Sequence, residues 1–304
     1  MKGRSLEDIL AFIAMASFWA INYPVLKISF NYDDPFAILF YRILFAGMSA
    51  LIIFSHRLRM PHDFKTNLKI FAVGLLSMVL FMSFWFLGEQ VEPASLSSIL
   101  VYTFPIFSLV FSGMFLGDRL TLESILASIL GFAGVVLIFI EQIGLTSIFG
   151  AFLLVISAIF WALGTIFYKK YLSAVSPVNV NTLQLLYSIP VLFIIAVAIS
   201  PAGVFSVNYQ TVFLTLILGV PGTAVAYLIY FHLFRKYDVS EISSYFFAVP
   251  ALSIVFSFAI LGEKSSVLTY IGFVMISVGM FVSYSKKKKT AKNDEIGNVT
   301  ESRS

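Results

Sequence analysis

The 304-residue sequence contains no cysteine and few charged residues. Without cysteine the chain can form no disulfide, no thiolate nucleophile and no cysteine metal site, so these three kinds of chemistry are excluded. Aspartate, glutamate, lysine and arginine make up only 12% of the residues, whereas a soluble domain has roughly a quarter. This scarcity of charge argues against a soluble globular protein.

The motifs of membrane enzymes are missing as well. The sequence has no HExxH or GxSxG motif, no phosphate-binding glycine loop and no carboxylate in the middle of an apolar run. An intramembrane enzyme is therefore the weaker alternative, and we expect no catalytic residue, cofactor or metal. Because proton coupling usually relies on an intramembrane carboxylate, facilitated diffusion, exchange, and coupling through an edge residue such as Glu89 all stay open.

Long apolar runs dominate what is present, since 59% of the residues are hydrophobic. A bilayer core about 30 Å thick requires about 20 apolar residues per helix. The runs and their polar breaks predict an all-α integral membrane protein with ten membrane-spanning helices. We expect these helices over residues 8–30, 35–55, 68–88, 93–116, 122–140, 147–168, 178–199, 211–234, 240–261 and 266–284.

The basic residues predict the orientation of these helices. Seventeen of the twenty lysines and arginines fall on the loops and termini of one side, and only Lys264 falls on loops of the other side. Because cytoplasmic loops are enriched in basic residues, we expect both termini of this cell-membrane protein in the cytoplasm. The tail 286–304 is expected to be disordered. Its basic cluster Lys286–Lys289 suits anionic lipid headgroups, so membrane lipid and not nucleic acid is the expected partner.

The two halves of the sequence, 1–145 and 146–285, are related. FWAINYPVLK, which contains Trp19 and Lys27, matches FWALGTIFYK, which contains Trp161 and Lys169, at an offset of 142 residues. Further along the chain the offset is 145, and it relates Gly74 to Gly219, Ser95 to Ser240, Pro105 to Pro250 and Gly117 to Gly262. Each half holds five predicted helices, an odd number, so the second half enters the membrane inverted. Inverted repeats are typical of secondary transporters that alternate between inward-open and outward-open states.

Several short motifs recur in a fixed order. They are W-x-x-N-x-x-x-x-K at Trp19, Asn22 and Lys27, P-x(6)-R at Pro35 and Arg42, and a fourth-helix pattern running from Ser95 through Pro105 to Gly117 and Asp118. Together they resemble the EamA family of the drug/metabolite transporter superfamily over residues 8–284. The second half departs from this pattern at Gly164 and Gln184. The resemblance implies that a small metabolite is moved outward, with amino acids as the leading class and a sugar or drug as the alternative cargo.

Polar and aromatic side chains at membrane depth are the candidates for substrate binding. Trp19 and Asn22 share one face of their helix, and Trp161 and Thr165 share the related face in the second half. Whether Asn22 binds substrate or a neighbouring helix is open at this stage. The predicted substrate-binding residues are Trp19, Asn22, Tyr102, Trp161, Thr165, Tyr227 and Phe247. Their rings suit a flat or aromatic cargo.

Three prolines and two charges lie inside predicted helices. Pro105, Pro221 and Pro250 predict hinges or cavity walls, because an internal proline leaves the carbonyl four residues earlier without its donor. A simple bend is the alternative. Lys27 and Arg42 can extend their long side chains to the membrane surface.

For Arg42 the other possibility is an acidic partner such as Glu89 or Glu92, or an anionic group of the substrate. Small residues spaced by four in the fifth and tenth predicted helices allow close packing, within one bundle or between two copies. The chain is therefore expected to be a monomer or a homodimer.

Overall fold

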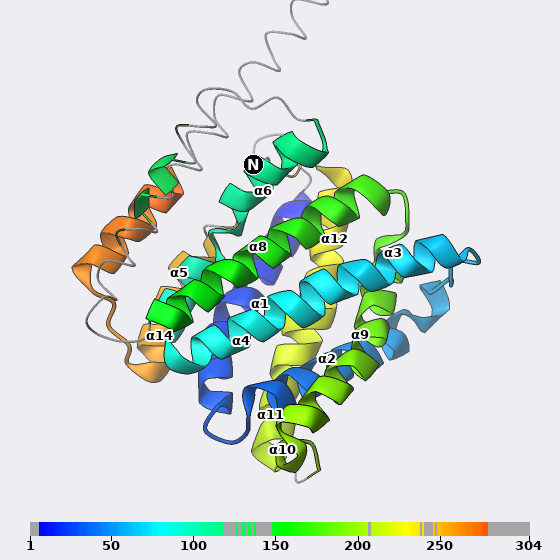
Figure 1. The fold of residues 1–304 in the computed structure, drawn as a ribbon, viewed down its shortest axis with the longest axis horizontal. Coiled ribbons are helices and arrows are strands. Elements are labelled where there is room, and N and C mark those ends of the chain that lie inside the picture. The colour runs from blue at the N-terminus through cyan, green and yellow to red at the C-terminus, as the bar shows by residue number, and fades with distance from the viewer. Residues whose placement is uncertain are drawn as a thin grey trace, which may run out of the picture.

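The computed structural model describes residues 6–117, 126, 129–131, 133–134, 137, 148–205, 208–237, 239, 246 and 248–278. Throughout these residues the chain forms helices joined by short turns, with no strand (Figure 1). The elements of the first half are α1 (Leu6–Ser29), α2 (Pro35–Phe54), η1 (Ser55–Arg57), α3 (Phe64–Gly74), η2 (Leu75–Leu80), α4 (Phe81–Val91), α5 (Ala94–Val101) and α6 (Phe104–Phe115). Those of the second half are α8 (Ile148–Tyr171), α9 (Pro177–Ile199), α10 (Pro201–Phe205), α11 (Tyr209–Gly219), η3 (Val220–Val225), α12 (Ala226–Lys236) and α14 (Ala248–Leu261).

Seven helical stretches in the described part are long and apolar enough to cross a membrane, and each coincides with a predicted span. They are Leu6–Ser29, Pro35–Arg57, Phe64–Val91, Ala94–Phe115, Ile148–Tyr171, Pro177–Ile199 and Tyr209–Lys236. The predicted spans 240–261 and 266–284 correspond to two shorter apolar helices, Ala248–Leu261 and Val267–Val278. Most of the span 122–140 and all of the tail 286–304 lie outside the described residues, so the count of ten helices stays a prediction.

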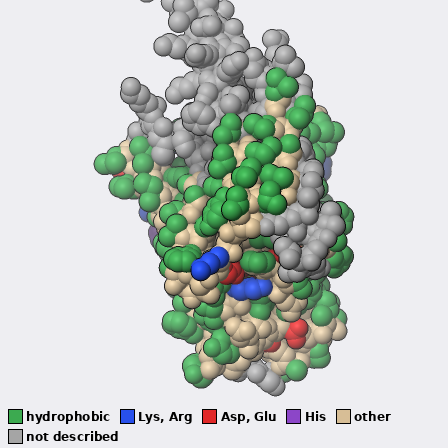
Figure 2. Space-filling model, turned by 90° about the vertical axis from the view of Figure 1, so that its left-hand side faces the viewer, with side chains coloured by type: hydrophobic (Ala, Val, Ile, Leu, Met, Phe, Trp, Pro, Cys, Tyr) green, Lys and Arg blue, Asp and Glu red, His purple; other side chains and the backbone are tan. Residues whose placement is uncertain are grey.

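The outer surface is consistent with a lipid environment. Figure 2 shows a face on which hydrophobic side chains cover much of the described surface and charged side chains are few. Large exposed side chains such as Ile52, Phe152 and Ile194 lie on the helices themselves, where water contact would be unfavourable. These observations support a multi-pass membrane protein.

The packing follows the two repeats. α1 packs on α14 and along α11–η3–α12, and α8 packs correspondingly on α6 and along α3–η2–α4 (Figure 1). α2 and α9, which occupy related positions in the two halves, pack against each other. The two halves therefore interlock, and their helices surround one shared centre.

Two glycines allow the close approach of these helices. A Cβ atom on Gly219 would lie 2.6 Å from the carbonyl oxygen of Arg42, and one on Gly74 would lie 3.0 Å from that of Gln184. Gly219 and Gly74 are related by the repeat, as are Arg42 and Gln184. Small residues permit such backbone contact between membrane helices, so the repeat conserves one helix-crossing geometry in both halves.

Each half also contains a π-helical turn at the same repeat position, η2 in the first half and η3 in the second. Pro221 lies in η3 and has no N–H to donate, which favours a locally widened turn. The Thr223 hydroxyl donates to the carbonyl of Leu218 (2.8 Å) and so satisfies part of the interrupted backbone. η2 contains no proline, so packing in the repeat preserves the widened turn there.

The predicted helix 93–116 is interrupted at Tyr102 and Thr103, between α5 and α6. Pro105 is the second residue of α6, and Pro250 lies in the first turn of α14. For Pro105 the expectation of a proline inside a continuous helix was therefore wrong, because in the first turn a proline removes no intrahelical hydrogen bond and Pro105 begins a new helical segment. For Pro250 most of the residues before α14 lie outside the described part, so that expectation stays a prediction.

The two repeated lysines, Lys27 and Lys169, bind backbone carbonyls at helix ends on opposite sides of the molecule. Lys27 Nζ donates to three carbonyl oxygens at the end of α4, those of Glu89 (2.8 Å), Gln90 (3.0 Å) and Glu92 (2.7 Å). Lys169 Nζ donates to the carbonyls of Phe234 and Tyr237 at the end of α12, each at 3.1 Å. A helix C-terminus leaves carbonyls unsatisfied and carries partial negative charge. Each lysine thus stabilises the helix end beside it, which explains why both repeats retain the charge.

Candidate functional site

The tryptophans of the two repeats meet at the centre of the molecule. Trp19 on α1 and Trp161 on α8 are both buried, with ring centroids 5.4 Å apart and planes at 83°. Phe104 stacks on Trp161 at 3.9 Å, and Phe246 stacks on Trp19 at 5.6 Å. Edge-to-face and stacked rings attract beyond their burial, so this aromatic cluster forms a rigid centre between the two halves.

A small cavity adjoins this cluster. It is lined by residues of both repeats, namely Trp19, Tyr23, Arg42, Phe81, Met82, Trp85, Tyr102, Trp161 and Tyr227. Its volume is about 10 Å³, which accommodates about one water molecule. The described conformation is therefore closed around the centre, and a metabolite would enter only after the helices separate.

The polar residues of α1 contact the π-helical turn η3. Trp19 Nε1 and Asn22 Nδ2 both donate to the carbonyl oxygen of Gly222, at 3.1 and 3.2 Å. Asn181 Nδ2 donates to the carbonyl of Ala224 at 2.8 Å. These contacts give the polar side chains of Trp19, Asn22 and Asn181 hydrogen-bond partners at membrane depth, where an unsatisfied polar group is costly. Asn22 therefore binds a neighbouring segment in this conformation.

Arg42 presents a buried positive charge to the cavity. Its side chain is 1% exposed, so the predicted extension to the membrane surface was wrong. Nε donates to the Thr223 hydroxyl at 2.8 Å, and the guanidinium lies 5.0 Å from the centroid of the Trp85 ring. Nη1 is buried and has no hydrogen-bond partner among the described residues. Nor does Arg42 form an ion pair there with Glu89 or Glu92, the partners suggested from sequence.

Two other predicted residues, Thr165 and Lys27, are not among those that line the cavity. The Thr165 hydroxyl donates to the Trp161 carbonyl (2.8 Å) and shares a hydrogen bond with the Tyr230 hydroxyl. Thr165 thus links two members of the aromatic cluster and does not contact the cavity itself. Lys27 donates hydrogen bonds to backbone carbonyls at the end of α4. Phe247 lies outside the described residues. Of the predicted binding residues, the structure brings Trp19, Tyr102, Trp161 and Tyr227 to the cavity wall.

Sequence reasoning named no binding residue on the third predicted helix, 68–88, although α4 supplies Phe81, Met82 and Trp85 to the cavity. The repeat contained the signal, because Met82 and Trp85 are related to Tyr227 and Tyr230 by the offset of 145. It also missed how deeply Glu89 is buried. Glu89 lies one helical turn after Trp85, and its carboxylate oxygen Oε2 accepts a hydrogen bond from Trp85 Nε1.

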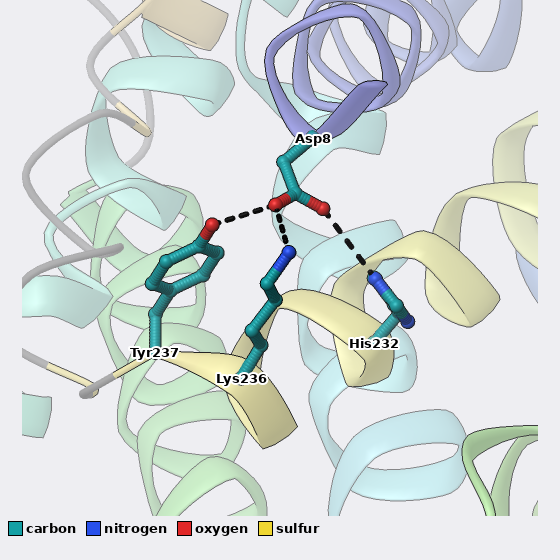
Figure 3. Close-up of polar contacts among 4 residues, drawn as sticks. All are labelled: Asp8, His232, Lys236 and Tyr237. Atoms are coloured by element: carbon teal, nitrogen blue, oxygen red, sulfur yellow. Dashed lines mark hydrogen bonds and ion pairs between the residues drawn. The ribbon is translucent and has the colours of Figure 1, made fainter. Parts of the chain in front are cut away.

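Hydrogen bonds between the two halves close both ends of the molecule. At one end, Asp8 of α1 accepts from Lys236 Nζ and from the Tyr237 hydroxyl (2.6 Å), and His232 Nε2 lies 3.5 Å from its other oxygen (Figure 3). At the other end, the carboxylate of Glu263 accepts from three groups at the start of α5. These are Ala94 N (2.9 Å), Ser95 N (3.0 Å) and Ser95 Oγ (3.0 Å).

Comparisons with known proteins agree with this arrangement. The sequence model of the EamA-like transporter family matches residues 6–140 and 148–285, one match for each repeat. The chain is 30% identical over 291 residues to an uncharacterized transporter of Bacillus subtilis, YvbV, covering 93% of both chains. It is 27% identical to an uncharacterized transporter of Archaeoglobus fulgidus, covering 89% of this chain and 96% of that one. A crystal structure with 18% identity superimposes with a TM-score of 0.71 over 94% of this chain and therefore supports the fold.

Proposed function

We propose that this chain, which belongs to the EamA-like transporter family of the drug/metabolite transporter superfamily, carries small metabolites that bear a carboxylate group. Amino acids are the leading class. The family and the named relatives support a membrane transporter of this superfamily. The cargo, the direction of movement and the mechanism of alternating access are our proposals.

The observation that supports the proposal is that Arg42 is buried beside the central cavity and has no carboxylate partner among the described residues. A buried guanidinium without a carboxylate partner is unfavourable at membrane depth, and such residues usually mark substrate or ion pathways. Nη1 finds no hydrogen-bond partner within the described part of the chain, and the side chain lines the central cavity. A substrate carboxylate can accept two parallel hydrogen bonds from the planar guanidinium, which would satisfy the charge.

The rest of the cavity wall favours an apolar or aromatic remainder of the cargo. Trp19, Trp161 and Tyr102 present rings, and the buried Tyr227 hydroxyl has no partner among the described residues. An amino acid with an aromatic side chain combines these requirements. A sugar or an uncharged drug, the alternative cargo, would have no group to neutralise Arg42.

The closed ends support the proposal of alternating access. The contacts of Asp8 with α12 and those of Glu263 with α5 each join the two halves. Breaking one set while keeping the other would open the cavity to one side at a time, as inverted repeats allow. Outward movement, which the family resemblance implies, requires that the cargo is more concentrated in the cytoplasm than outside.

The test is counterflow in proteoliposomes that are loaded with unlabelled L-phenylalanine and supplied with labelled tracer. Wild-type protein should accumulate tracer, and Arg42→Leu and Tyr102→Ala should abolish accumulation. Losing one partner of a buried charge pair costs about 2–5 kcal/mol of binding, which is enough to remove exchange at ordinary concentrations. Arg57→Leu, which removes an exposed arginine, is the matched control.

Phenethylamine, which lacks the carboxylate of phenylalanine, should compete poorly for the wild-type protein. Equal competition by both compounds, or undiminished exchange by folded Arg42→Leu protein, would refute the role of Arg42. Absence of exchange with any amino acid from folded protein would exclude the leading cargo and direct the search to sugars and drugs.

A further inference from the structure

We propose that Glu89 is a proton-binding site of this transporter, and that a proton and the substrate carboxylate bind together. The inference rests on the proposed function, because it assigns the substrate carboxylate to Arg42. It adds a second ligand and a residue outside the cavity wall.

The carboxylate of Glu89 is buried, and its two oxygens have different surroundings. The residue is 0% exposed, although Gln90, the next residue along the chain, is exposed. Oε2 accepts from Trp85 Nε1, whereas Oε1 is buried without a hydrogen-bond partner among the described residues. A buried carboxylate oxygen without a donor is costly when ionised, but it can hold a proton. Glu89 is therefore poised to exchange a proton near the end of α4.

Trp85 connects this carboxylate with the cavity. Its Nε1–H contacts Glu89, and its ring lines the cavity and lies 5.0 Å from the guanidinium of Arg42. The indole is thus placed between the carboxylate and the cation. A change in the charge or position of Arg42 alters the electrostatic potential at the Glu89 carboxylate. The effect is transmitted by Trp85 and directly through space, because the buried surroundings screen charges poorly.

The charged and titratable groups around Glu89 come from several elements. They are Tyr23 and Lys27 on α1, Arg42 on α2, Glu92 after α4, Tyr102 after α5 and Glu263 after α14. α8 approaches this part of α4 through Gly150 and Leu154, neither of which is titratable. Lys27 is engaged with backbone carbonyls. Arg42 is therefore the cation whose charge the substrate can alter.

The sign of the coupling follows from this arrangement. While Arg42 has no counter-charge, its positive charge favours the ionised form of Glu89. A substrate carboxylate that pairs with Arg42 cancels this field and adds a negative charge nearby, so Glu89 takes up a proton from solvent. Binding of the two ligands is thus mutually favourable. An inward proton gradient would drive uptake of the substrate, and outward movement would require the substrate's own gradient.

Two measurements test the proposal. In the first, L-phenylalanine is added to weakly buffered protein in detergent, and a pH dye records proton movement. Wild-type protein should take up about one proton for each substrate bound. Glu89→Gln protein should bind L-phenylalanine without proton uptake, whereas Glu7→Gln, which changes an exposed carboxylate, should behave as wild type. Proton release, or uptake that persists in Glu89→Gln, would overturn the coupling.

The second measurement needs no substrate. Infrared difference spectra of the membrane-embedded protein between acidic and alkaline pH should contain the carbonyl band of a buried protonated carboxyl group, and Glu89→Gln should lack it. An unchanged band would overturn the proton site even if L-phenylalanine is transported. Loss of the band without any binding of L-phenylalanine would support Glu89 and refute only the proposed cargo. If Glu89→Gln does not fold, Trp85→Phe should make the band persist to higher pH, because it removes the donor to the ionised oxygen.

Discussion

Replacing Lys27 by methionine tests the explanation for the repeated lysines most directly. Methionine keeps a long apolar chain but removes the ammonium, which donates to three carbonyls at the end of α4. Hydrogen bonds to a charged group are each worth about 1.5–3 kcal/mol, and ordering a lysine side chain costs about 2 kcal/mol. Three such bonds less this ordering cost give about 2.5–7 kcal/mol, and we expect Lys27→Met to lower the free energy of unfolding by an amount in this range.

The repeat provides an internal comparison. Lys169 donates to two carbonyls at longer distances, so Lys169→Met should lower the free energy of unfolding by a smaller amount, about 1–4 kcal/mol. The two lysines lie at opposite ends of the molecule, so the effects in the double variant should add. Equilibrium unfolding in mixed micelles, followed by tryptophan fluorescence, measures all three variants. Lys65→Met, which alters an exposed lysine, is the control.

The result that would refute this reasoning is a Lys27→Met protein as stable as Lys65→Met. It would mean that water or lipid headgroups satisfy these carbonyls as well as the lysine does. Lys27→Arg separates charge from geometry, because a guanidinium keeps the charge but has a planar fork of donors. We expect Lys27→Arg to fall between wild type and Lys27→Met.

Three further predictions concern packing and the closed ends. Gly219→Ala should lower the free energy of unfolding by about 1–3 kcal/mol, because its Cβ would lie 2.6 Å from a backbone oxygen of α2. Gly74→Ala should cost less in the same unfolding assay, since its shortest contact, 2.9 Å, is with a serine hydroxyl that can rotate. Because the chain has no native cysteine, a Met82→Cys variant reports access to the cavity by its rate of labelling with an impermeant thiol reagent. Asp8→Asn should speed this labelling from one side of the membrane and Glu263→Gln from the other. If either variant were labelled equally fast from both sides of the membrane, the contacts of Asp8 and Glu263 would not close opposite sides of the cavity.

Much of the fold follows from local properties of the sequence. Seven predicted spans have helices at the same positions, because the length of an apolar run determines whether a helix can cross a bilayer. The repeat likewise predicted the relation of Trp19 to Trp161, and their rings meet at the centre. The interruption near Pro105 was foreseen, although the proline begins a helical segment there and does not kink one.

The partners of individual polar groups could not be predicted in the same way. Arg42 contacts Thr223, which is remote in sequence, and it does not pair with Glu89, although both lie near the central cavity. Glu89 appeared to be an edge residue, and its burial depends on how α4 packs against α1 and α8. Spacing along one helix determines which residues share a face, but not which helix covers that face.

By itself, the sequence determined that the protein is helical, spans a membrane and contains two repeats, because the lengths of the apolar runs and the internal repetition can be read directly from the residues. Only the tertiary structure decided that the repeated lysines bind helix ends, that Arg42 has no carboxylate partner in the described part of the chain and that Trp85 links it to Glu89. These features depend on the approach of helices to within hydrogen-bonding distance. That approach is set by the packing of the whole bundle.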